Sequence, residues 1–152
     1  MHKRFRQDVE IAAPLELVRE QLAALRHDIP AHDRFAVASM LLRDYAVDGK
    51  VVEEFLVRDR IGPGPMAFTF DYHTCITLAE TDGTITYNTR LPAGIHLLTR
   101  QSVSPCDGRT QVRETIDVTA PLALLGIVYI GVTAGQKAVL AQLKAATESL
   151  VH

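Results

Sequence analysis

The chain has 152 residues, of which 47% are hydrophobic and 22% are charged. This composition excludes a disordered chain, and the length suits one compact domain spanning residues 1–152. The formal net charge of -2 provides no large positive field for phosphate groups, so we expect no nucleic-acid partner.

The first predicted elements are a strand and a helix. Residues 4–11 alternate between charged and less polar side chains, the period of two that a half-buried strand shows. Pro14 follows at a position that the first turn of a helix tolerates. The apolar residues after it recur at spacings of three and four, which predicts an amphipathic helix to about Arg26. These apolar residues are Leu15, Val18, Leu22 and Leu25.

Metal ligands are sparse in the sequence. Residues 27–33, which read HDIPAHD, contain two His-Asp pairs, but no spacing defines a ligand set, so we predict a polar loop. Pro30 prevents the helix from continuing through it. The two cysteines, Cys75 and Cys106, form no CxxC motif and lie near no histidine at zinc-ligand spacing. We therefore expect no metal and no other cofactor.

Residues 35–118 have the pattern of six strands separated by turn residues. Short connections of this kind predict an antiparallel meander. The turn signals are Asp48-Gly49, Gly62-Pro63-Gly64-Pro65, Asp82-Gly83, Pro92-Ala93-Gly94 and Asp107-Gly108.

The turns also predict a register, because opposite residues in an antiparallel pair have a constant sum of residue numbers and point to the same face. The first hairpin is expected to pair Leu78 with Ile85, Ile76 with Tyr87 and Thr74 with Thr89. The second is expected to pair Leu91 with Ile95, Thr89 with Leu97 and Tyr87 with Thr99. The third is expected to pair Thr99 with Glu114, Leu97 with Ile116 and Ile95 with Val118.

This register separates an apolar face of the sheet from a polar one. The apolar face includes Phe68, Phe70, Tyr72, Ile76, Leu78, Ile85, Leu97, Val103, Val112, Ile116 and Val118. On the polar face, His73 is expected between Glu54 and Arg90, and His96 opposite Arg90 and Asp117. We interpret these groups as a solvated charge network without a catalytic role.

The last predicted element is one long helix from Pro121 to about Leu150. Residues 122–134 are uncharged, but a helix of this length spans about 20 Å against a hydrocarbon core of about 30 Å. We therefore predict a buried helix and no membrane span. Gly126, Gly131 and Gly135 lie within it, and they either pack closely on the sheet or leave room for a ligand.

The order of these elements resembles the START-like or helix-grip (SRPBCC) superfamily, which includes polyketide cyclases and dehydrases, lipid-transfer domains and quinone-binding proteins. The matching segments are residues 9–18 (VEIAAPLELV) and residues 140–144 (LAQLK) through Glu148. The resemblance implies an α+β helix-grip fold, in which a curved antiparallel sheet of about seven strands wraps around the long C-terminal helix as a single START-like domain. It also implies a ligand cavity between sheet and helix, but it specifies no reaction.

Polar residues interrupt the predicted apolar face. Because buried polar groups need partners, such a cluster indicates a solvated or ligand-filled space. The candidate ligand-binding residues are Tyr72, Thr74, Tyr87, Thr89, Thr99, Gln101 and Glu114, together with Tyr129 of the last helix, whose hydroxyl is expected at the edge of the cavity.

Glu114 is the candidate catalytic residue, because it lies between Val112 and Ile116 on the apolar face. Burial there would raise its pKa and suit it to acid or base chemistry. In the alternative interpretation Glu114 has only a structural role and is hydrogen-bonded to Thr99 and Tyr87.

A second pair of carboxylates is expected on the inner face, where the register places Asp44 opposite Glu53 and Thr74 beside Glu53. Two like charges opposite each other destabilise a sheet. Either one carboxyl is protonated, or both lie at a wet cavity mouth, or a bulge shifts the register.

The sequence thus favours a protein that binds a small, mostly apolar molecule, such as a lipid, an isoprenoid or an aromatic polyketide. The first alternative is a cyclase or dehydrase that uses Glu114, and the second is a non-catalytic protein-interaction module. We expect a monomer or a homodimer. The charged start of the chain, MHKRFR, has no signal-peptide pattern and predicts a cytoplasmic protein.

Overall fold

A computed structural model describes residues 1–27, 29, 36–61, 64–79 and 83–151 of the chain. Seven strands and two α-helices follow one another in the predicted order. They are β1 (His2–Ile11), α1 (Leu15–His27), β2 (Ala36–Val47), β3 (Lys50–Ile61), the short 3-10 helix η2 (Gly64–Met66), β4 (Phe68–Ala79), β5 (Ile85–Leu91), β6 (Ile95–Cys106), β7 (Arg109–Thr119) and α2 (Leu122–Ser149).

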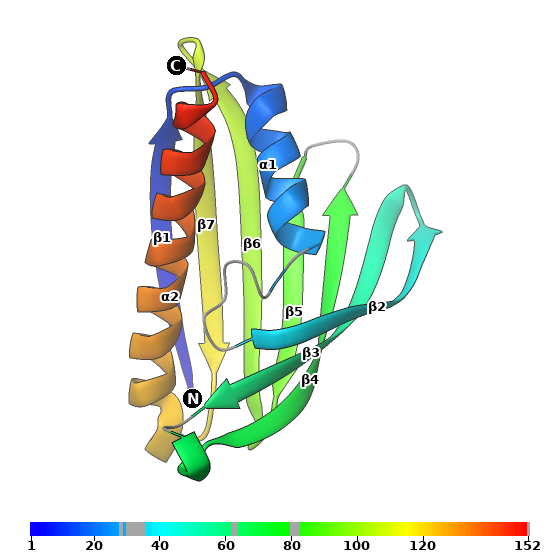
Figure 1. Ribbon diagram of the computed structural model, residues 1–152, viewed down its shortest axis with the longest axis vertical. Helices are drawn as coiled ribbons and strands as arrows, with labels where there is room; N and C mark the ends of the chain where they lie inside the picture. The colour runs from blue at the N-terminus through cyan, green and yellow to red at the C-terminus, as the bar shows by residue number, and fades with distance from the viewer. Residues whose placement is uncertain (28, 30–35, 62–63, 80–82, 152) are drawn as a thin grey trace.

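The seven strands form one antiparallel sheet in the order β1-β7-β6-β5-β4-β3-β2. The strands β2 to β7 are the meander that the turn residues predict, and β1 pairs with β7 at the far edge. The sheet is strongly curved, and α1 and α2 both lie over the same face of it (Figure 1). The α+β class and the arrangement of a curved sheet with a long C-terminal helix are therefore confirmed.

Two of the three predicted hairpin registers are confirmed, and the third is displaced. The β4–β5 and β5–β6 pairs match the expected ones, including Ile76 with Tyr87 and Tyr87 with Thr99. Between β6 and β7, however, Glu114 is opposite Gln101 rather than Thr99.

The displacement arises at the turn between β6 and β7. The expected register implies a four-residue loop over residues 105–108, whereas Cys106 pairs directly with Arg109. Asp107 and Gly108 alone make the turn, with φ angles of 49° and 79° that are typical of a type I′ hairpin. Because the shift is two residues, every side chain keeps its predicted face.

The outer face of the sheet carries the charged residues that the sequence predicts, but several of them contact other residues than those expected. Asp117 accepts hydrogen bonds from Arg4 at 2.6 Å and from His2 at 3.0 Å, which ties β1 to β7. His96 is opposite Arg90 as expected, but opposite Thr119 rather than Asp117, and its Nε2 lies 2.6 Å from Oδ1 of Asn88. His73 is opposite Arg90 and Leu56, with Glu54 further along β3.

The inner face of the sheet packs against the helices in separate apolar clusters. One cluster joins both helices to β1, β6 and β7, and it includes Ile11, Val18, Leu22, Val103, Val112, Leu140 and Leu143. A second joins β3, β4 and β5 through Phe55, Val57, Ile76 and Ile85. The third anchors the start of α2 through Leu125 to Ile116 and Val118 of β7. The space between these clusters holds the candidate site.

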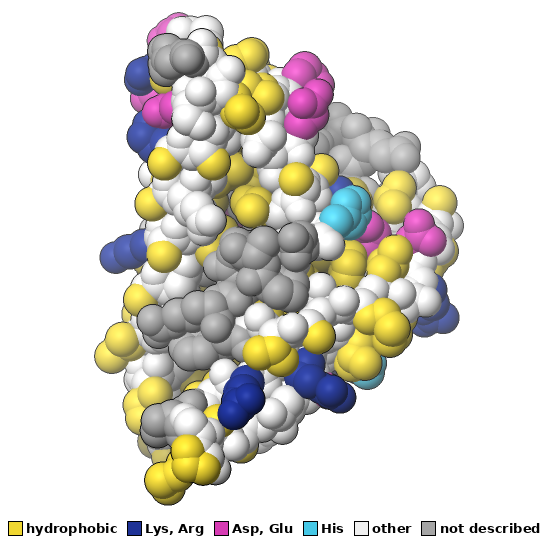
Figure 2. Space-filling model, viewed as in Figure 1, with side chains coloured by type: hydrophobic (Ala, Val, Ile, Leu, Met, Phe, Trp, Pro, Cys, Tyr) yellow, Lys and Arg dark blue, Asp and Glu magenta, His cyan; other side chains and the backbone are white. Residues whose placement is uncertain are grey.

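The prediction that the apolar half of α2 is buried is wrong. Leu125 packs inward, but Ile127 is 75% exposed, and Leu122 and Ile130 are exposed as well. Hydrophobic side chains are visible at the surface over α2 and around the β2–β3 hairpin (Figure 2). By length and composition α2 is apolar enough to cross a membrane. In this structure one side of it packs on β1 and β7 and the other side is uncovered.

Neither interpretation of the α2 glycines holds. Gly126, Gly131 and Gly135 are exposed, and a Cβ atom added to any of them would meet nothing within 4 Å. They therefore neither permit a close approach to the sheet nor leave space for a ligand.

Candidate functional site

A cavity of about 170 Å³ lies between the sheet and the two helices. Its apolar walls come from α1, from Ile29 after the end of α1, from β6 and from α2. The residues of these three elements are Leu22, Leu25, Leu97, Val132, Val139 and Leu140. Its polar lining consists of Arg26, Gln136 and seven residues of β4 to β7: Tyr72, Thr74, Tyr87, Thr89, Thr99, Gln101 and Glu114.

The polar side chains from the sheet lie side by side because of the strand pairing. Thr74 is opposite Thr89, Tyr87 is opposite Thr99, and Gln101 is opposite Glu114. The Oγ1 atoms of Thr74 and Thr89 are 3.0 Å apart. The structure thus brings together seven of the eight residues that the sequence selects as ligand-binding candidates, and their role in binding stays a prediction.

Tyr129 is the candidate that the structure places elsewhere. It does not line the cavity, and its hydroxyl donates to the carbonyl oxygen of Arg4 at 3.5 Å. The ammonium group of Lys3 lies 5.1 Å from the centroid of its ring. These contacts with β1 place Tyr129 beside the first strand rather than at the edge of the cavity.

Glu114 is buried, with 3% of its surface exposed, and it has different partners from those expected. The Nε2 atoms of Gln7 and Gln101 donate to its two carboxylate oxygens at 2.9 Å and 3.0 Å. Burial raises the pKa of Glu114, and the two amide donors partly oppose this shift by favouring the charged form. The alternative interpretation names Thr99 and Tyr87 as the hydrogen-bond partners of Glu114. This assignment is wrong, because the donors are Gln7 and Gln101.

The phenol of Tyr87 is also perturbed. Burial raises its pKa to about 12, with the charges of Glu114 and Glu53 adding to the rise and Arg26 opposing it. The Tyr87 hydroxyl therefore stays protonated at neutral pH and can donate a hydrogen bond into the cavity.

Arg26 is a functional candidate that the sequence analysis does not select. Its Nε donates to Glu53 Oε1 at 3.0 Å, and only 10% of the Arg26 side chain and 8% of the Glu53 side chain are exposed. His27 Nε2 lies 2.7 Å from the other oxygen of Glu53. A signal for Arg26 exists in the sequence, since it follows Leu22 by four residues and therefore shares its inward face of α1.

The expected pair of Asp44 and Glu53 is confirmed in register, but Asp44 is exposed, whereas Glu53 is buried. Thr74 pairs with Phe55 rather than lying beside Glu53. Neither carboxylate lines the cavity. The buried carboxylate is compensated by Arg26 and His27, so the two acidic residues do not form an acid–base pair.

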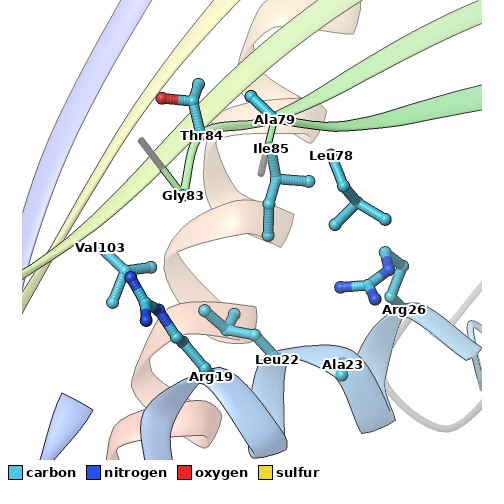
Figure 3. A pocket seen from close by; sticks show the side chains of 10 residues that line it. All are labelled: Arg19, Leu22, Ala23, Arg26, Leu78, Ala79, Gly83, Thr84, Ile85 and Val103. Carbon is cyan, nitrogen blue, oxygen red and sulfur yellow. The ribbon is translucent and has the colours of Figure 1, made fainter. Parts of the chain in front are cut away.

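A second pocket, of about 210 Å³, adjoins the first where α1 faces the β4–β5 hairpin. Leu22 and Arg26 line both pockets. The side chains of Arg19 and Arg26 project from α1 toward the strands in this pocket (Figure 3). The region between the helix and the sheet is therefore open at this end, with a guanidinium group on each side of Leu22.

Metal ligands do not gather anywhere in the described part of the chain, where no group of three His, Cys, Asp or Glu side chains could hold an ion. The predicted polar loop over residues 27–33 lies mostly outside the described residues, which include only His27 and Ile29 of it.

Searches with the sequence find no matching family model and no matching curated protein. Solved structures, in contrast, match over nearly the whole chain. The aromatase/cyclase ZhuI from Streptomyces sp. R1128 is 19% identical with a TM-score of 0.73, covering 100% of this chain and 97% of its own. Norcoclaurine synthase from Thalictrum flavum is 15% identical with a TM-score of 0.68, covering 99% and 87%.

The protein Ara h 8.0201 is similar to the same extent, with 13% identity, a TM-score of 0.71 and coverage of 98% of this chain and 99% of its own. At such low identities the likeness concerns the fold alone. It confirms that the chain has the helix-grip fold, as its resemblance to that superfamily predicts.

Proposed function

We propose that this helix-grip protein binds a small, mostly apolar molecule in the cavity between its sheet and its two helices. The observation that carries the proposal is the cavity itself, where apolar side chains of α1 and α2 face a row of polar side chains from β4 to β7. Ligand sites in proteins are commonly apolar clefts with a few polar groups that orient the ligand.

In this proposal the apolar walls provide the affinity, at roughly 25 cal/mol for each Å² of apolar surface removed from water. Tyr87, Thr99 and Glu114 orient the polar part of the ligand. The cavity volume of about 170 Å³ is close to that of an engineered cavity of about 150 Å³ that holds benzene. It therefore has room for about one ring or a short branched chain, with any remainder of the ligand extending past Arg26.

The proposal is tested by native mass spectrometry of the freshly purified protein, followed by extraction and identification of any bound molecule. A matched pair of variants on α2 then locates the binding site. Val132→Trp places a large side chain in the cavity, whereas Ile130→Trp places the same side chain on the exposed side of the same helix.

We expect Val132→Trp to weaken binding of the extracted molecule, or of a fluorescent apolar probe, by at least about tenfold, and Ile130→Trp to leave it unchanged. Equal affinities in both variants, or no uptake of any apolar molecule by the wild type, would contradict the proposal.

A second candidate function, that of a cyclase or dehydrase, is favoured by Glu114. The raised pKa of this buried carboxylate at the cavity wall suits proton transfer. Three of the similar structures are of proteins named aromatase/cyclase or ARO/CYC. In this function Glu114 would take a proton from the carbon beside a carbonyl group and return it to the oxygen that leaves as water.

The variant Glu114→Gln separates the two functions, because it preserves the size of the side chain but cannot take up a proton. Loss of turnover of a carbonyl-bearing substrate with binding retained would support the enzyme. Retention of both binding and turnover would exclude this role for Glu114.

A further inference from the structure

One end of the Gln101 amide has no hydrogen-bond partner among the described residues. This end is the Oε1 atom, which is buried, and the whole residue is only 5% exposed. The other end of the same amide, Nε2, donates to Glu114 at 3.0 Å. Because Gln101 lines the cavity, this unsatisfied acceptor lies at the wall of the proposed ligand site.

The orientation of the amide follows from the chemistry of Glu114. An ionised carboxylate only accepts hydrogen bonds, so the amides of Gln7 and Gln101 must both present their N–H groups to it. If the Gln101 amide were turned around, its carbonyl oxygen would face a carboxylate oxygen without a proton between them. The acceptor end of Gln101 is therefore directed away from Glu114.

A buried acceptor without a donor is unfavourable, and native proteins rarely leave one unsatisfied. In the free protein Gln101 Oε1 has almost no accessible surface, so it stays unsatisfied until the side chains around it move. A ligand whose binding moves these side chains, and which carries a donor, satisfies the acceptor. The site is thus complementary to an O–H or N–H group rather than to a carbonyl oxygen.

Desolvation distinguishes a neutral donor from a cationic one. The guanidinium group of Arg26 lines the same cavity, but Glu53 balances its charge. The carboxylate of Glu114 already accepts two hydrogen bonds, and apolar side chains form the opposite wall. An ammonium group would lose its hydration there without adequate compensation, whereas a hydroxyl group loses much less.

We propose that Gln101 selects ligands that carry a neutral hydroxyl group, as in a phenol or an enol, and that this group donates to Gln101 Oε1. The inference rests on the proposed binding function and adds the class of ligand. Gln101 acts as a specificity-determining residue, and the apolar remainder of the ligand fills the space toward Val132, Val139 and Leu140.

The test uses two small probes of nearly the same shape, p-cresol and p-xylene, which differ by a hydroxyl group in place of a methyl group. Affinities are measured for both by protein-observed NMR titration, which also shows whether each variant is folded. The measured quantity is the ratio of the dissociation constant of p-xylene to that of p-cresol. Because burial of the apolar ring contributes to both dissociation constants, this contribution largely cancels in the ratio.

The variants are Gln101→Met and, as a control, Gln7→Met. Both remove one amide donor from Glu114, but Gln7 does not line the cavity, so only the first removes the acceptor offered to the ligand. Gln101→Leu, which removes the same acceptor, is measured in parallel. We expect the ratio to fall by about tenfold in both Gln101 variants and to stay at the wild-type value in Gln7→Met.

The outcomes separate the inference from the function on which it rests. If wild type and Gln101→Met bind both probes with the same ratio, the inference is wrong while the binding function stands. If Gln7→Met lowers the ratio as much as Gln101→Met, the preference depends on Glu114 and the inference is also wrong. If the wild type binds neither probe nor any other apolar molecule, the proposed function itself fails.

Discussion

Arg26 and Glu53 form a nearly buried ion pair that joins the end of α1 to the first part of β3, with Nε and Oε1 3.0 Å apart. The pair lies at the border of the cavity, because Arg26 also lines it. A buried pair of this kind stabilises a fold less through its own attraction than through the penalty for leaving one charge alone.

We predict that Glu53→Met lowers the free energy of unfolding by about 3 kcal/mol, because it leaves the Arg26 guanidinium buried without a counter-charge. Arg26→Met should cost less, since His27 still contacts Glu53. The double variant should be more stable than the sum of the single effects implies. Urea denaturation of all four proteins measures this coupling.

The control for this double-mutant cycle of Arg26 and Glu53 is the exposed pair of Arg58 and Asp71 on neighbouring strands, with Nε and Oδ1 2.8 Å apart. Its geometry is similar but both side chains are in water, so Asp71→Met should cost less than about 1 kcal/mol. If the Glu53 and Asp71 variants lost equal stability, burial of the Arg26–Glu53 pair would not explain its effect.

The contribution of Glu114 to the free energy of unfolding should decrease as the pH rises. Its pKa in the folded state is raised by burial, so the folded protein holds this proton more tightly than the unfolded chain. Its contribution to stability is therefore complete at low pH and falls as the pH rises from the ordinary pKa of glutamate to the raised value.

The difference in unfolding free energy between wild type and Glu114→Gln isolates this contribution, because both proteins keep the carboxyls whose pKa is lowered, Asp71, Asp117, Glu54 and Glu148. We expect the difference to fall with rising pH through that window and then to level off. A difference that rises with pH would show that the two amide donors, and not burial, dominate the pKa of Glu114.

Tyr87 should ionise only near pH 12, since burial raises its pKa to about 12. The ultraviolet difference titration between wild type and Tyr87→Phe should therefore show one transition close to that pH, with circular dichroism confirming that the fold persists. Because the folded-state pKa is raised from about 10, the stability that Tyr87 contributes is lost between about pH 10 and 12. A transition near the ordinary pKa of tyrosine would show that solvent reaches the phenol freely.

The parts of the site that the sequence predicts are those set by local geometry. Short turns fix which residues face each other, so the alternation along β4 to β7 is enough to place Thr74, Tyr87, Thr99 and Glu114 on one face. Even the displaced register of Glu114 preserves its face, because the loop is shorter than expected by two residues.

The parts that the sequence does not predict depend on contacts between distant segments. Gln7 reaches Glu114 through the pairing of β1 with β7, which no turn specifies. The contact of Arg26 with Glu53 depends on how α1 docks on the sheet. The exposed side of α2 is unexpected for a related reason, since an apolar helix composition indicates that some face is buried but not how much of it the sheet can cover.

The two sides of α2 should therefore differ sharply in their response to the same kind of substitution. Leu140 is 1% exposed, lines the cavity and belongs to the cluster that joins both helices to the sheet, whereas Ile127 is 75% exposed on the same helix. We expect Leu140→Ala to lower the free energy of unfolding by about 3 kcal/mol through lost burial and an enlarged cavity. Ile127→Ala should change it by no more than about 0.5 kcal/mol, because alanine favours helix and no packed contact is lost. Chemical denaturation of both variants measures these values, and a large loss from Ile127→Ala would mean that the outer side of α2 is covered in solution by a second molecule.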